Sequence, residues 1–81
     1  MQIRPLNKQV LKQIKKFGIE KKCKKQIALF VENPLHPSLR MEKLEPTHVG
    51  LYSFRIDKSF RATFRIRNKI AEIILITKHY Q

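Results

Sequence analysis

The chain has 81 residues, enough for one small domain with a thin core, which argues against a deeply buried active site. Its 18 lysines and arginines against 6 aspartates and glutamates give a net charge of +12, and so self-repelling a surface points to a polyanionic partner, first nucleic acid and then an acidic protein. The hydrophobic content of 42% is that of a folded chain and excludes a disordered basic tail, so residues 1–81 are predicted to form a single domain.

Two helices are predicted in the first half of the chain. After a short extended start, Asn7 suits the N-cap of the first helix, and Gly18 stands where that helix would end. Apolar residues then recur every three or four positions from Ile19 until the Asn-Pro pair at 33–34, which stops the second helix. The two helices would form a hairpin.

A loop and three strands are predicted to follow. Three prolines and a glycine interrupt NPLHPSLRMEKLEPTHVG, within which LRMEKL allows a short extended piece. Residues 51–56 and 60–67 alternate between apolar and polar side chains, and the last run, IAEIILIT, is apolar on nearly both faces. The expected fold class is α+β, with the two N-terminal helices packed on the apolar face of a small, three-stranded antiparallel sheet.

Four arginines of the predicted hairpin share one face. Period-two alternation puts Arg55, Arg61, Arg65 and Arg67 on the side that the helices leave bare. This concentration of charge has two readings: a solvated face that keeps the protein soluble, or a rigid cationic surface for a polyanion.

The inventory of reactive groups is sparse. Asp57 is the only aspartate and the glutamates are scattered, so no carboxylate cluster for metal-assisted hydrolysis is visible, and no glycine-rich phosphate loop or nucleophile motif occurs. No metal site and no cofactor are therefore predicted. RNA cleavage remains feasible because RNA carries its own nucleophile, the 2′-hydroxyl. The terminal TKHY supplies His79, whose ordinary pKa suits proton transfer near neutrality, next to Tyr80.

The expected compartment is the cytoplasm. A single cysteine, Cys23, excludes an internal disulfide and a cysteine-built zinc site, and it is expected to fill the core. The sequence has no apolar run of membrane-spanning length and no signal-peptide stretch at its start, so no membrane partner is expected.

The chain resembles the RelE/ParE superfamily of bacterial type II toxins. The resemblance runs through ENPLHPSLRMEKL, GLYSFRIDKSFRATF and ILITKHY, which follow that family's loop, hairpin and terminal strand in order. It implies the RelE-like fold and, in the RelE-like branch, metal-independent mRNA cleavage in the ribosomal A site, where the protein also meets ribosomal RNA. It further implies an acidic antitoxin that silences the toxin.

YoeB-type members of the family match best, and they imply a catalytic set. Arg61 matches the strand arginine that binds the scissile phosphate, His79 and Tyr80 match the terminal pair, and Glu42 falls at the general-base position. Other RelE-like members use lysines in this region, so Lys43 is a rival to Glu42. The RNA-binding residues expected around this set are Arg40, Lys43, Arg55, Arg65, Arg67 and Lys78.

Several alternatives stay open at this point. His79 could belong to a frayed end, Tyr80 could pack the terminus, and Glu42 could simply pair with a neighbouring basic residue. The first strand is shorter than in the family, and only Gln81 follows Tyr80. Two other functions compete: a ParE-like inhibitor of DNA gyrase without nuclease activity, and a non-catalytic basic module that binds nucleic acid.

Overall fold

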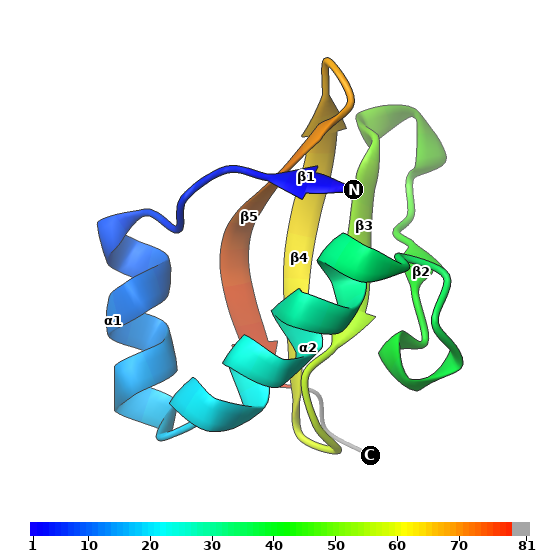
Figure 1. The fold of residues 1–81 in the computed structure, drawn as a ribbon. Coiled ribbons are helices and arrows are strands. Elements are labelled where there is room, and N and C mark those ends of the chain that lie inside the picture. Colours follow the sequence, from blue (N-terminus) through cyan, green and yellow to red (C-terminus); the bar gives the residue numbers. More distant parts are fainter. Residues whose placement is uncertain (79–81) are drawn as a thin grey trace.

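A computed structural model describes residues 1–78 as two helices packed against a five-stranded sheet (Figure 1). In chain order the elements are β1 (Gln2–Ile3), α1 (Lys8–Phe17), α2 (Glu20–Glu32), the short 3-10 helix η1 (Pro37–Leu39), β2 (Glu42–Lys43), a second short 3-10 helix η2 (Thr47–Val49), β3 (Leu51–Arg55), β4 (Phe60–Arg67) and β5 (Ile70–Lys78). The predicted α+β class is confirmed. Among the described helices, none has both the length and the apolar character needed to cross a bilayer.

Local sequence signals set the ends of both helices. The Asn7 side chain accepts a hydrogen bond from the Val10 N–H at 2.8 Å, which is the N-cap that the sequence predicts. Gly18 ends α1 in the left-handed conformation with φ 65°, a region that glycine enters without the steric cost of a Cβ atom. Asn33 caps α2, so the helix stops before Pro34 as expected.

The sheet is larger than the sequence predicts. Strands β3, β4 and β5 form the expected antiparallel meander, but two strands of two residues each extend it to the order β1-β5-β4-β3-β2. Strand β1 pairs with β5 in parallel, so the sheet is mostly, and not wholly, antiparallel. The predicted meander is confirmed, and the extended start and the extended piece within LRMEKL supply the two added strands, which are too short to show a period of two.

The core lies on one face of the sheet, and both helices contribute side chains to it. Phe30 of α2 is fully buried and stacks on Phe54, with ring centroids 5.0 Å apart, and it meets Phe64 edge-on at 4.9 Å. Cys23 is also buried, with 2% of its surface exposed, and burial raises the pKa of its thiol to about 11. Its predicted place in the core is confirmed.

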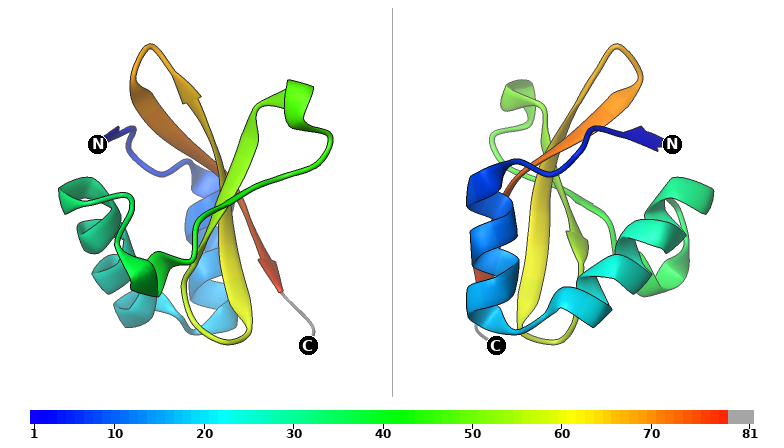
Figure 2. Two further views of the ribbon diagram at one scale, coloured as in Figure 1. Left: turned by 90° about the vertical axis from the view of Figure 1, so that its right-hand side faces the viewer. Right: turned by 60° about the vertical axis from the view of Figure 1, so that its left-hand side comes forward.

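The two helices cover different parts of the sheet. Helix α2 lies across one face, whereas α1 runs beside β5 (Figures 1 and 2). The Gln13 side chain of α1 donates to the Ile76 carbonyl at 3.2 Å and accepts from the Ile76 N–H at 2.9 Å, so it satisfies the backbone of β5 where β1 no longer pairs with it. Neither long helix lies on the opposite face, which is left for other contacts.

Candidate functional site

The register of the strands brings the predicted site residues to the face away from α2. Direct cross-strand partners share a face, and Arg61 is the partner of Arg55 on β3 and of Thr77 on β5. Ser53 is the partner of Thr63 on one side and of Glu42 on the other. We call this side of the sheet the polar face, and the four arginines of the hairpin all belong to it.

Arg61 is held rigidly on the polar face. Only 9% of its surface is exposed. Its Nε donates to the Ser53 hydroxyl at 3.0 Å, and its Nη2 donates to the Arg40 carbonyl at 2.6 Å and to the Ser53 carbonyl at 3.3 Å. These bonds fix the plane of the guanidinium, which is the condition for an arginine that must meet a phosphate at a set angle.

The second terminal nitrogen of Arg61, Nη1, reaches solvent. Within residues 1–78, no acceptor contacts its Nη1. No buried side-chain nitrogen in that part of the chain lacks a partner, so Nη1 keeps contact with solvent. Arg61 therefore presents two N–H donors at the surface while its other donors are anchored.

Arg61 lies near one negatively and one positively charged side chain. Burial lowers the pKa of its guanidinium, the Glu42 carboxylate raises it, and the neighbouring Arg55 lowers it. An arginine remains protonated near neutrality despite such a shift. The strand register places one carboxylate and two guanidiniums on the polar face, and the described chain offers Glu42 no ion pair.

The two candidate general bases lie on opposite faces. Glu42 shares the polar face with Arg61, but Lys43 is the cross-strand partner of Tyr52, whose ring stacks on Phe64 at 5.6 Å on the other side of the sheet. The Lys43 ammonium lies 5.7 Å from the centre of the Tyr52 ring, a cation–π contact. The structure therefore brings Glu42, and not Lys43, together with Arg61.

The remaining predicted cations are spread out. Arg55 donates from Nε to the Asp57 carbonyl at 3.2 Å, and Arg65 is bound to Glu72 at 2.8 Å. Arg67 is exposed toward the far end of β4. Lys78 is the partner of Phe60, which faces away from Arg61. The binding of RNA by these groups stays a prediction.

Arg40 supports the site through its backbone. It follows η1 in the left-handed region with φ 42°, uncommon for a residue with a side chain, and this turn aims its carbonyl at Arg61. His79 and Tyr80 lie outside the described residues. Residues 1–78 contain no group of three side chains suited to hold a metal ion.

One partner in the site was missed by the sequence reasoning. Ser53 is 3% exposed and supplies two of the three acceptors that hold Arg61. The available signal was its position, since the alternation of LYSFR places Ser53 on the arginine side of β3, where a small hydroxyl can reach a neighbouring strand.

Comparison with known proteins shows where this fold occurs. No protein-family model matches the sequence, and the search of curated proteins gave no match. Among solved structures, a YoeB/ParE toxin from Agrobacterium tumefaciens is 18% identical, with 99% of this chain and 100% of that chain covered and a TM-score of 0.73.

Two further structures agree. A heterotetrameric YoeB-YefM toxin-antitoxin complex from Staphylococcus aureus contains a chain 23% identical, with 99% and 98% coverage and a TM-score of 0.71. YafQ from E. coli is 14% identical, with 96% and 90% coverage and a TM-score of 0.71. The chain therefore has the fold of these YoeB/ParE and YafQ toxins, as the resemblance of its sequence implied. The likeness spans the chain from end to end, and at these identities it defines the fold.

Proposed function

We propose that this protein is the toxin of a type II toxin–antitoxin system and cleaves mRNA on the ribosome. The observation that carries the proposal is Arg61, whose guanidinium is anchored by Ser53 and Arg40 while its Nη1 faces solvent. Such a group is built to bind a phosphate and to stabilise the charge that develops on it. The resemblance of the sequence to the RelE-like branch and the shared fold support the same function.

The proposed reaction uses the nucleophile of the RNA itself. Glu42 takes the proton from a 2′-hydroxyl, and the 2′-oxygen attacks the adjacent phosphorus to form a 2′,3′-cyclic phosphate. Arg61 donates to a non-bridging oxygen of the crowded phosphate. The bond from phosphorus to the 5′-oxygen breaks, and that oxygen receives a proton from His79, with Tyr80 beside it. In this scheme Glu42 gains one proton and His79 loses one, and no metal ion takes part.

The polar face suits this substrate class. It lies on strands and is not covered by α1 or α2 (Figure 2). It combines Glu42 with Arg55 and Arg61. The His-Tyr pair directly follows β5, whose Thr77 is the strand partner of Arg61. The proposed inhibitor is an acidic antitoxin, since the net charge of +12 favours such a partner and one of the similar structures is a toxin–antitoxin complex.

The proposal is tested by mapping mRNA ends in a bacterial translation system. We expect Arg61→Gln to lower cleavage by about 10²–10³-fold, because a donor to the developing charge is lost. The control is Lys69→Gln, which removes one positive charge from an exposed turn residue outside the predicted RNA-binding set and should change cleavage by less than a few fold. Urea unfolding of both variants shows whether each remains folded at the assay temperature.

Two results would overturn the proposal. A folded Arg61→Gln variant with full cleavage would remove Arg61 from the reaction. Intact mRNA together with accumulated DNA breaks would instead favour the gyrase-inhibitor function.

A further inference from the structure

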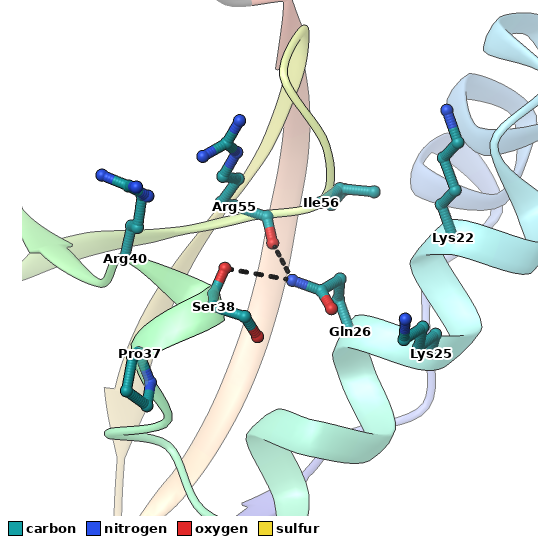
Figure 3. A pocket seen from close by; sticks show the side chains of 8 residues that line it. All are labelled: Lys22, Lys25, Gln26, Pro37, Ser38, Arg40, Arg55 and Ile56. Carbon is teal, nitrogen blue, oxygen red and sulfur yellow. Dashed lines mark hydrogen bonds between the residues drawn. The ribbon is translucent and has the colours of Figure 1, made fainter.

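A second basic site lies beside the polar face, at the end of β3. A hollow of about 520 Å³ opens between α2, η1 and the last residues of β3 (Figure 3). Lys22 and Lys25 of α2 line one side, and Arg40 and Arg55 line the other. Its lining contains no acidic residue. We call it the basic hollow.

The floor of the basic hollow is fixed by a buried amide. Gln26 of α2 is 7% exposed, and its side-chain nitrogen donates to the Arg55 carbonyl at 2.8 Å and to the Ser38 carbonyl at 3.4 Å (Figure 3). One side chain thus ties α2 to both η1 and β3. The cations around the hollow are therefore mounted on elements whose spacing is set, and the hollow is a built feature.

The positive charges of the basic hollow are mostly uncompensated. The Lys22 ammonium forms an ion pair with the Asp57 carboxylate at 3.1 Å. In the described chain no carboxylate pairs with Lys25, Arg40 or Arg55. Four like charges around one cavity repel each other, and an anion bound among them would relieve that repulsion. The volume falls in the range of sites for small ligands and is ample for a phosphate group.

Arg55 connects the basic hollow to the Arg61 site. Its side chain lines the hollow, and it is also the direct strand partner of Arg61 and lowers the pKa of that residue. A chain with regularly spaced negative charges could thus bind to both places at once. An acidic amphipathic peptide would need exposed apolar surface to bind, but Ile56 in the lining is only 4% exposed. The hollow therefore suits a nucleic-acid backbone better than such a peptide.

We propose that the basic hollow is a second phosphate subsite, which holds a phosphate of the RNA backbone near the one bound by Arg61. The subsite rests on the proposed function for its substrate, since it extends the same RNA path. In this arrangement Lys25 and Arg40 contact a phosphate that is not cleaved, and they contribute to RNA affinity and to its position on the polar face.

The test measures binding and needs no cleavage. The probe is a fluorescent six-nucleotide RNA with 2′-methoxy groups throughout, which cannot be cut, titrated with protein at several salt concentrations. The variant is Lys25→Gln, and the matched control is Lys21→Gln on the same helix, which lines no part of the hollow. We expect the negative slope of log K against log salt to become less steep by about 0.7 in Lys25→Gln, the value for one single-strand phosphate contact, and to change less in Lys21→Gln.

A second arm locates the phosphate. One phosphate linkage of the RNA at a time is replaced by a neutral methylphosphonate. At one linkage near the one bound by Arg61, the replacement should lower the affinity of the wild-type protein several fold. The same replacement should leave the affinity of Lys25→Gln unchanged. Equal slopes for the two lysine variants, or losses that simply add at every linkage, would overturn the subsite. So would a loss of affinity for an acidic peptide with RNA binding unchanged.

The two proposals fail separately. RNA binding that depends on Lys25 in a protein that leaves mRNA intact would reject the nuclease and keep the subsite. Cleavage that depends on Arg61, together with identical RNA binding by Lys25→Gln and Lys21→Gln, would reject the subsite alone.

Discussion

The two faces of the sheet bury their side chains by different means. On the face toward α2, Phe30, Phe54 and Phe64 are 0% exposed and contact one another through their rings. On the polar face, Ser53 and Arg61 are nearly as buried, at 3% and 9%. There the contact is a hydrogen bond that the charged guanidinium of Arg61 donates to the Ser53 hydroxyl. One face stabilises the fold by removing apolar surface from water, and the other uses that stability to hold a cation in place.

This difference bears on the proposed function. Burying a charge is unfavourable unless it is paired or hydrogen-bonded, and well-packed apolar residues at the same positions would serve stability as well or better. The polar face therefore carries a group that the core does not require. Arg61, with one nitrogen left for solvent, is the group on which the proposed function rests.

The largest expected effect lies on the α2 face. Phe30→Ala should lower the free energy of unfolding by about 3–5 kcal/mol, because it removes an aromatic ring from a closed cluster and leaves a cavity. Urea unfolding followed by circular dichroism measures the change. Leu35→Ala, at a residue 80% exposed, is the control and should stay within about 0.5 kcal/mol of the wild type. A small effect at Phe30 would mean that the cluster does not dominate stability.

The second largest expected effect is on mRNA cleavage, and it compares the neighbouring residues Glu42 and Lys43, which lie on opposite faces of the sheet. Glu42→Gln should reduce mRNA cleavage by about 10²-fold or more, because the proton acceptor on the polar face is lost. Lys43→Gln on the other side should leave cleavage within a few fold and cost about 0.5–1 kcal/mol of stability through the lost contact with Tyr52. Cleavage rates and urea unfolding are measured for both. A large loss of cleavage in Lys43→Gln alone would exchange the two roles.

The smallest expected effect is a pH dependence at the edge of the α2 face. Burial acts to raise the pKa of Asp57, but hydrogen bonds from the Ser59 N–H, from Lys22 and from the Phe60 N–H outweigh it, and the pKa is lowered. Because the unfolded chain then takes up the proton first, the stabilisation is present above the ordinary aspartate pKa and is lost as the pH falls below about 4.

The free energy of unfolding of Asp57→Asn should therefore fall less with acid than that of the wild type. The difference should be less than about 1 kcal/mol, because the ion pair with Lys22 lies at the surface. Urea unfolding between pH 3 and pH 7 measures the difference. Glu32→Gln is the control, since Glu32 has no ion pair within the described chain, and it should follow the wild-type curve. Parallel curves for Asp57→Asn and the wild type would show that the carboxylate adds nothing to stability.

Much of the fold could be predicted because its signals are local. Asn7 and Gly18 mark the ends of α1 by their own backbone and capping chemistry, whatever lies around them. The alternation of β3 and β4 likewise predicts the shared face of the four arginines. Strand β1 was expected only as a short extended start, and its pairing could not be predicted, because two residues carry no period and the pair Gln2↔Ile70 joins segments far apart in the chain.

The candidate site was predicted in part. Arg61 and Glu42 were chosen by family resemblance, and their common face follows from strand register. Ser53 and Gln26 were missed, because a serine in a strand and a glutamine in a helix look like ordinary surface residues until their burial and partners are known. The roles of His79 and Tyr80 stay predictions.

The amino-acid sequence alone determined the net charge, the two amphipathic helices and the alternation that separates arginines from aromatic rings, since each depends on neighbouring residues. Only the tertiary structure decided which of Glu42 and Lys43 faces Arg61, and which cations meet around the basic hollow. Alternation requires adjacent strand residues to point to opposite sides, but which side each one takes depends on the pairing of β2 with β3, and a shift by one residue would exchange them.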